Sequence, residues 1–159
     1  MPTVLVTYYS RSGNTAKMAE AVAQGAREVA GVTVDLRPSS EVTPDDLVKY
    51  DGIIMGSPVY FGSMAAELKT LIDESVKHYG KFTGKVGGAF ASSGGIGGGT
   101  ETTVLDILKA MLIHGMIVQG TTKGAHYGPI SVGAPNDKVA SECEQLGQRV
   151  AELANKLFP

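Results

Sequence analysis

The chain contains no tryptophan and only one cysteine among its 159 residues. A single cysteine excludes an internal disulfide and a CxxC redox pair. Cys143 falls at an apolar position of an expected helix, so we interpret it as a core residue. The three histidines, His78, His114 and His126, are far apart and lack the spacing of metal ligands. The sequence therefore predicts no metal site.

Runs of like charge and long apolar runs are also missing. The formal net charge is -2 and no basic cluster is present, so we expect no nucleic-acid partner. No apolar run approaches membrane-spanning length, so we expect no membrane insertion. Residues 1–3 lead directly into a strand pattern without a signal-like segment. These absences predict a cytoplasmic protein.

Strand-like and helix-like patterns alternate along the whole chain, whose length predicts one domain over residues 1–159. We expect strands at residues 4–9, 32–36, 52–56 and 85–91, and a fifth that begins at 116–118. Helices are expected between them, with a closing helix at 139–157 and a loop at 120–136. This alternation predicts an α/β fold, a doubly wound five-stranded parallel sheet in the order 2-1-3-4-5 with helices on both faces.

The loop after the first strand is rich in hydroxyl groups and opens a helix. It consists of Ser10, Arg11, Ser12, Gly13, Asn14 and Thr15. In such sheets ligands bind beyond the carboxyl ends of the strands, and free N–H groups at a helix N-terminus attract phosphate. The loop therefore predicts a phosphate site without a lysine, although an ordinary capped turn fits this loop alone equally well.

The loops after the third and fourth strands have unusual compositions. The third-strand loop contains Pro58, Val59, Tyr60, Phe61 and Gly62. Two aromatic residues at the ligand edge suit a flat apolar partner, and the alternative is that they anchor the next helix in the core. The fourth-strand loop contains Ser93, Gly94, Gly95, Ile96, Gly97 and Gly98. Its glycines let a backbone lie close to a planar ligand, and the alternative is a flexible linker.

Together the three loops predict a site for one phosphate and a large flat ring. The glycine spacing matches neither GxxxxGK[ST] nor GxGxxG, which argues against a nucleoside triphosphate or a dinucleotide bound in the Rossmann manner. Flavin mononucleotide (FMN) is the natural candidate. The loops also lack the carboxylates of a response regulator and the nucleophilic cysteine of a low-molecular-weight phosphatase.

The segment 9–15 resembles the phosphate loop of flavodoxin-like proteins. The segments 56–64 and 92–101, with His114-Gly115-Met116, are similar to one branch of that superfamily. This branch comprises the FMN-dependent NAD(P)H:quinone oxidoreductases that are also called tryptophan-repressor-binding proteins. The resemblance covers nearly the whole chain, and it implies bound FMN, NAD(P)H as the electron donor and a quinone as the acceptor.

The resemblance also implies roles for individual residues. Ser10 to Thr15 match the phosphate-binding turn, Val59 to Phe61 match the segment beside the isoalloxazine ring, and Ser93 to Gly98 match the loop at the ring's polar edge. His114 matches a histidine near the ring and the substrate pocket, and with Tyr60 it is the expected catalytic residue. Tyr79 falls near a substrate-side tryptophan of the branch.

Two departures from the branch concern assembly and donor binding. The branch carries an extra segment before its third strand and another before its last helix, and both help it to form tetramers. Here they are reduced to residues 39–50 and 121–129. We therefore expect a homo-oligomer but do not predict that it is a tetramer. The branch often has an arginine at the position of Tyr60, and its absence removes a charge that could help to hold a nucleotide phosphate.

Three functions stay open at this point. The first is an FMN-dependent oxidoreductase that transfers two electrons from NAD(P)H to a quinone. The second is a flavodoxin that carries electrons without a substrate of its own, although the net charge of -2 and the lack of tryptophan are atypical of such carriers. The third is a non-catalytic flavin-binding module.

Overall fold

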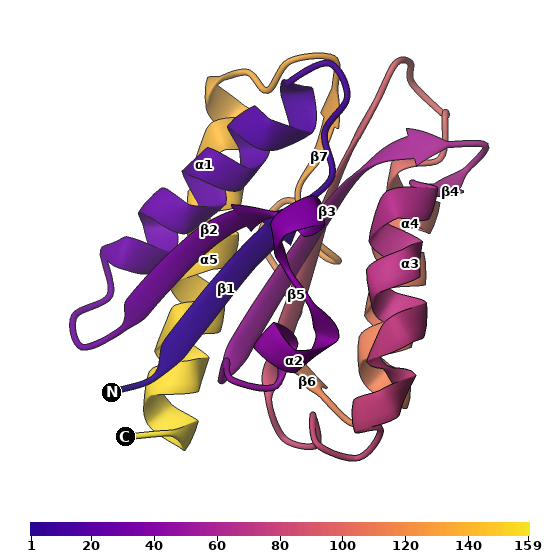
Figure 1. The fold of residues 1–159 in the computed structure, drawn as a ribbon. Helices are drawn as coiled ribbons and strands as arrows, with labels where there is room; N and C mark the ends of the chain where they lie inside the picture. Colours follow the sequence, from indigo (N-terminus) through magenta and orange to yellow (C-terminus); the bar gives the residue numbers. More distant parts are fainter.

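The computed structural model describes all residues from Met1 to Pro159 (Figure 1). Its strands are β1 (Thr3–Tyr8), β2 (Thr33–Pro38), β3 (Gly52–Tyr60), β4 (Ser63–Met64), β5 (Val86–Ser93), β6 (Ile117–Val118) and β7 (Ile130–Val132). Its α-helices are α1 (Asn14–Arg27), α2 (Pro44–Leu47), α3 (Ala66–Glu74), α4 (Thr100–Ile113) and α5 (Asp137–Leu157). Short 3-10 turns follow β2 at Ser39–Glu41 and α3 at Ser75–His78.

The central strands follow the predicted order. They lie as β2-β1-β3-β5-β6, and each neighbouring pair is parallel. This order places the reversal of the winding between β1 and β3, as predicted. The doubly wound flavodoxin-like sheet is therefore confirmed.

The strand count differs from the prediction, because the sheet has seven strands rather than five. β4 turns back antiparallel on the end of β3, and β7 pairs with the end of β5 while β6 pairs with its start. Residues 130–132 lie in the stretch that was predicted to be entirely loop. A three-residue strand has too little pattern of its own to be recognised, and only its pairing with β5 makes it extended.

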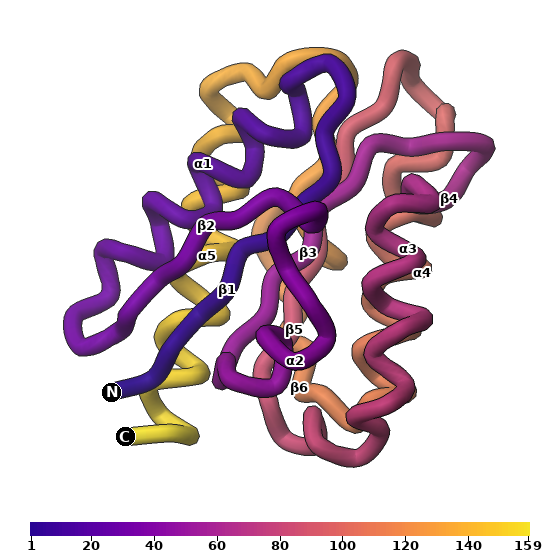
Figure 2. Tube along the Cα trace, in the orientation of Figure 1, coloured from indigo at the N-terminus to yellow at the C-terminus, as the bar shows by residue number.

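Helices cover both faces of the sheet. α1 and α5 lie side by side on one face, and α3 and α4 lie on the other (Figures 1 and 2). Each face buries its own apolar cluster, one built around Val6, Ile54 and Phe90 and the other around Leu5, Leu68 and Ile107. Burial on both sides explains why the central strands read as continuous apolar runs. No helix is long and apolar enough to cross a membrane.

The short helix α2 has a complete capping box. The Thr43 hydroxyl accepts a bond from the Asp46 N–H, and the Asp46 carboxylate accepts bonds from the Thr43 N–H and hydroxyl. Pro44 stands in the first turn, as the sequence pattern predicts. These bonds, with Lys49, hold the pKa of Asp46 well below its ordinary value. Local chemistry thus starts a helix of only four residues.

Two strands run further toward the carboxyl edge than predicted. β3 continues to Tyr60, and β5 continues to Ser93. The added residues are paired, since Pro58 lies opposite Ser92, and Ser57 lies opposite Ala91 at the predicted end of the other strand. Residues expected in loops are therefore held by sheet hydrogen bonds.

Candidate functional site

The first loop is folded so that its amides converge on one oxygen atom. The Ser10 hydroxyl accepts bonds from the N–H groups of Gly13 and Ala16, each at 3.2 Å. Gly13 precedes α1 with a φ of 98°, a left-handed conformation that glycine adopts at little cost. Because these amides stand at the start of a 14-residue helix, the dipole favours an anion there. These two bonds fix the shape of the loop, and the helix N-terminus that it leads into fits a phosphate group.

The other residues of the first loop divide into exposed and buried ones. Arg11 and Ser12 are exposed, and Asn14 is half-buried. Thr15 is buried, and its hydroxyl lies 2.9 Å from the hydroxyl of Ser92 at the end of β5. This bond ties the phosphate-type loop to the strand that leads into the glycine-rich loop.

The predicted aromatic loop is the tip of a β-hairpin. Tyr60 ends β3 and pairs with Ser63 of β4, so Phe61 and Gly62 form a two-residue turn. Both have positive φ, 50° and 78°, as in the hairpin turns that match the twist of the strands. The Phe61 side chain is fully exposed, which excludes the alternative that it anchors the core. The half-buried Tyr60 meets Tyr9 edge to face, with ring centroids 6.4 Å apart.

The glycine-rich loop projects from the body of the molecule. A β-carbon added at Gly94, Gly95 or Gly97 would meet no atom within 4 Å, and Ile96 is almost fully exposed. The loop is nevertheless shaped by its own bonds: the Ser93 hydroxyl donates to the Gly95 carbonyl at 2.9 Å, and the Gly98 N–H donates to the same carbonyl. Its open, uncovered backbone fits a planar ring laid against it.

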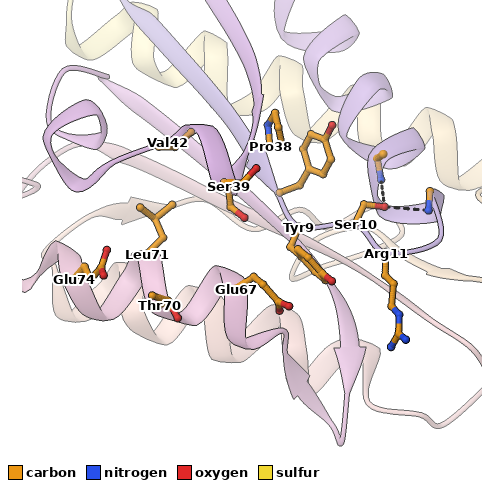
Figure 3. A pocket seen from close by; sticks show the side chains of 14 residues that line it. Tyr9, Ser10, Arg11, Pro38, Ser39, Val42, Glu67, Thr70, Leu71 and Glu74 are labelled. Atoms are coloured by element: carbon orange, nitrogen blue, oxygen red, sulfur yellow. Dashed lines mark hydrogen bonds between the residues drawn. The ribbon is translucent and has the colours of Figure 1, made fainter.

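A cleft of about 720 Å³ adjoins the first loop (Figure 3). Its lining includes three predicted residues, Ser10, Arg11 and Gly13, but neither the hairpin tip nor the glycine-rich loop. Tyr9 from the end of β1 and Glu67 from α3 point toward one another in it (Figure 3). Burial, and then the Glu67 carboxylate, raise the pKa of Tyr9. The volume lies within the range of small-molecule sites.

His114 lies at the opposite edge of the sheet from the three loops, which corrects the expectation that it stands near the ring within its own chain. It follows α4, whose 14 residues span roughly 20 Å from the glycine-rich loop toward the amino edge. Directly after it, Ile117 pairs with Val86, the first residue of β5. Sequence similarity located the histidine on its helix, and the predicted parallel sheet implies its edge, because a connecting helix runs back from the carboxyl edge to the amino edge.

The surroundings of His114 are those of a packed side chain. Its Nε2 lies 2.8 Å from the Ser75 hydroxyl, which itself donates to the Ile72 carbonyl. Nε2 must therefore carry the proton, and Nδ1 is buried without a partner. Phe82 packs on the imidazole ring with the two ring centroids 4.5 Å apart, and burial lowers the pKa of His114. Within its own chain the side chain contributes to packing at the amino edge.

Three residues at the carboxyl edge were not predicted as site residues. Tyr9 and Glu67 meet in the cleft, and Thr102 in the first turn of α4 donates to the hairpin tip at Gly62. Tyr9 could have been found, because it directly precedes the phosphate-type loop. Glu67 and Thr102 carry no sequence signal, since each reaches the site only through the packing of its helix.

Comparisons with known proteins agree with this geometry. A family model described as NADPH-dependent FMN reductase matches residues 3–127. A flavodoxin of Aquifex aeolicus is 39% identical over 160 residues, which cover 96% of this chain and 86% of that protein. An NAD(P)H dehydrogenase (quinone) of Archaeoglobus fulgidus is 34% identical over 190 residues, which cover 99% of this chain and 100% of that protein.

A solved structure is similar over the full length. The flavodoxin, WrbA-like protein from Agrobacterium tumefaciens matches with a TM-score of 0.83 at 27% identity, and the match covers 99% of both chains. The fold, the three loops and the family match point the same way. The chain belongs to the NADPH-dependent FMN reductase family, on a flavodoxin-like fold.

Proposed function

We propose that this protein is an FMN-dependent oxidoreductase that transfers two electrons from NAD(P)H to a quinone. The observation that carries the proposal is the convergence of three loops at one sheet edge: an amide cluster at a helix N-terminus, an aromatic hairpin tip and an uncovered glycine backbone. Family membership and relatives named NAD(P)H dehydrogenase (quinone) support the same activity.

The cofactor-binding residues in this proposal are those of the three loops. They are Ser10, Arg11, Ser12, Gly13, Asn14 and Thr15 for the phosphate; Pro58, Val59, Tyr60, Phe61 and Gly62 for the ring; and Ser93, Gly94, Gly95, Ile96, Gly97 and Gly98 for the ring's polar edge. His114 is omitted, because α4 carries it to the other edge of the sheet.

Bound FMN would supply the redox chemistry, which accepts electrons as hydride and releases them to the quinone. The chain's own residues would bind the cofactor and orient it. The Gly13 and Ala16 amides bond to the Ser10 hydroxyl and shape the first loop, so that the start of α1 would hold the phosphate through the helix dipole, and the exposed backbone of the glycine-rich loop would stabilise charge at the ring's polar edge. Tyr60, which meets Tyr9 edge to face, would lie beside the bound ring.

The proposal is tested by an absorbance spectrum of the purified protein, followed by stopped-flow reduction with NADPH and then NADH. We expect a bound-flavin spectrum, rapid bleaching by a reduced nicotinamide nucleotide, and reoxidation by added benzoquinone or naphthoquinone. Protein that neither carries nor takes up FMN would refute the proposal. Flavin that binds but shows no turnover with a nicotinamide nucleotide and a quinone would indicate a non-catalytic flavin-binding module.

One observation favours the flavodoxin alternative. The alignment with the Aquifex aeolicus flavodoxin spans 160 residues, close to the length of this chain, whereas the alignment with the Archaeoglobus fulgidus enzyme spans 190. The quinone dehydrogenase thus carries inserted segments that this chain lacks. Measured flavin potentials separate the two functions: an enzyme is expected to take up two electrons at nearly one potential, and a carrier to show two widely separated one-electron steps.

We extend the proposal to assembly and location. Four large apolar side chains are exposed around the amino edge, Val76, Tyr79, Leu112 and Ile113. Exposed apolar patches often mark protein contacts, and we infer that this face joins copies of the chain in a homo-oligomer. A cytoplasmic location is part of the proposal, because that compartment supplies NAD(P)H.

A further inference from the structure

The tip of the β3–β4 hairpin lies directly against the start of α4. A β-carbon added at Gly99, just before α4, would stand 2.7 Å from the Cα of Gly62. The Thr102 hydroxyl lies between two carbonyl oxygens, 2.7 Å from that of Gly62 and 2.9 Å from that of Gly99. The hairpin turn and the end of the glycine-rich loop are therefore joined through one hydroxyl group.

A second bond joins the same two elements one helical turn further along. The Ser63 hydroxyl donates to Asp106 Oδ2 at 2.7 Å, and Lys109 Nζ lies 2.6 Å from the other carboxylate oxygen. Lys109, and then Ser63, lower the pKa of Asp106, so the acceptor is ionised at neutral pH. A hydrogen bond to an ionised acceptor is stronger than a neutral one.

The base of the hairpin is also fixed. The Ser57 hydroxyl, fully buried, accepts a bond from the Ala65 N–H at 2.8 Å. The hairpin is thus held at its base by the sheet and along its side by α4. The glycine-rich loop is different, since a β-carbon added at Gly94, Gly95 or Gly97 would meet no atom within 4 Å.

The hairpin and the glycine-rich loop are the two segments that we propose for the flavin ring, and α4 continues directly from the second of them. We infer that Ser63, Thr102 and Asp106, which we call the hairpin latch, are positioning residues that fix the spacing between these two segments. This inference rests on the proposed function. The latch sets how tightly the ring is held and how its reduced form is stabilised, without touching the ring.

The test uses two substitutions and matched controls. Thr102→Val keeps the side-chain shape and removes the donor, and Thr102→Ser restores it. Asp106→Ala removes the acceptor of Ser63 together with the Lys109 pair. Thr83→Val is the first control, because its hydroxyl also bonds to a loop carbonyl, Gly80, but at the amino edge. Asp73→Ala is the second control, because it removes an equivalent Lys69 pair on α3 without a hairpin bond.

The readouts are the FMN dissociation constant, the flavin midpoint potential and the thermal midpoint of the apoprotein. We expect Thr102→Val and Asp106→Ala each to raise the dissociation constant about three- to tenfold and to shift the potential. Thr102→Ser and both controls are expected to behave as wild type. A purely structural role would lower the thermal midpoint and leave the potential unchanged.

Two outcomes would overturn the inference in distinguishable ways. If the wild-type protein does not bind FMN, the proposed function fails and the latch fails with it. If the wild type binds FMN but both latch variants match their controls in affinity and potential, the latch alone is refuted. Should Asp106→Ala fail to fold, the Thr102 series decides by itself, since Thr102 is exposed and its substitution leaves no cavity.

Discussion

At the scale of single residues, the site depends more on backbone amides than on charged side chains. The first loop is shaped by N–H bonds to the Ser10 hydroxyl at the start of α1, and no lysine takes part. A carboxylate introduced into this loop would repel a bound phosphate directly. Substitution in the loop therefore tests the site directly.

Ser12→Glu is expected to raise the FMN dissociation constant at least about tenfold, because it places a carboxylate beside the proposed phosphate position. Fold stability should be preserved, since a carboxylate near the start of α1 interacts favourably with the helix dipole. Fluorescence titration of the apoprotein measures the affinity. Ser141→Glu, an exposed site on α5, is the control. Equal affinity in both variants would count against the phosphate assignment.

Asp46 allows a prediction about pH. Its pKa is lowered in the folded state, so its contribution is present above about pH 4, the unfolded value, and is lost as pH falls through the folded pKa. Asp46→Ala is expected to cost about 1 kcal/mol of unfolding free energy at pH 7, and less below pH 4. Urea unfolding at several pH values measures the difference. A gap between wild type and variant that stays constant down to pH 3 would contradict this account.

At the scale of elements, patterned segments were predictable and short pairings were not. The closing helix was recognised from its apolar spacing, and it forms at Asp137–Leu157. β7 and the hairpin partner β4 were missed, because both follow stretches rich in glycine or aromatic residues that were assigned to loops, whereas the equally short β6 was found from the apolar residues at 116–118. The location of His114 was missed although the predicted fold implies it: a helix that connects two parallel strands starts at the carboxyl edge and ends at the amino edge, so a residue at its end lies away from the site.

The contact between α1 and α5 provides an element-scale prediction. A β-carbon added at Gly147 would lie 1.9 Å from the carbonyl oxygen of Val22, so the two helix backbones meet without a side chain between them. Gly147→Ala should destabilise the fold by about 1–3 kcal/mol, although alanine has the higher helix propensity. Ser141→Ala on the same helix is the control, and thermal or urea unfolding is the measurement. A stabilised Gly147→Ala variant would show that the helices separate at little cost.

At the scale of the whole molecule, the two edges of the sheet present different groups at the surface. The carboxyl edge gathers the loops of the candidate site, and the amino edge exposes the apolar side chains of Val76, Tyr79, Leu112 and Ile113. The sequence predicted the candidate site at the carboxyl edge, because the loops there have distinctive compositions. It could not predict the exposed apolar patch at the amino edge, since exposed and buried apolar residues look alike in a helical pattern.

The proposed homo-oligomer leads to the last prediction. Light scattering should give a mass that is a multiple of 16.5 kDa. Ile113→Glu is expected to shift that mass toward the monomer, because a carboxylate in a desolvated contact is costly, and to leave the FMN spectrum of the flavin site unchanged. Leu105→Glu, on the same helix but outside this patch, is the control. A wild-type protein that stays monomeric at micromolar concentrations would refute the assembly and leave the three-loop site unaffected.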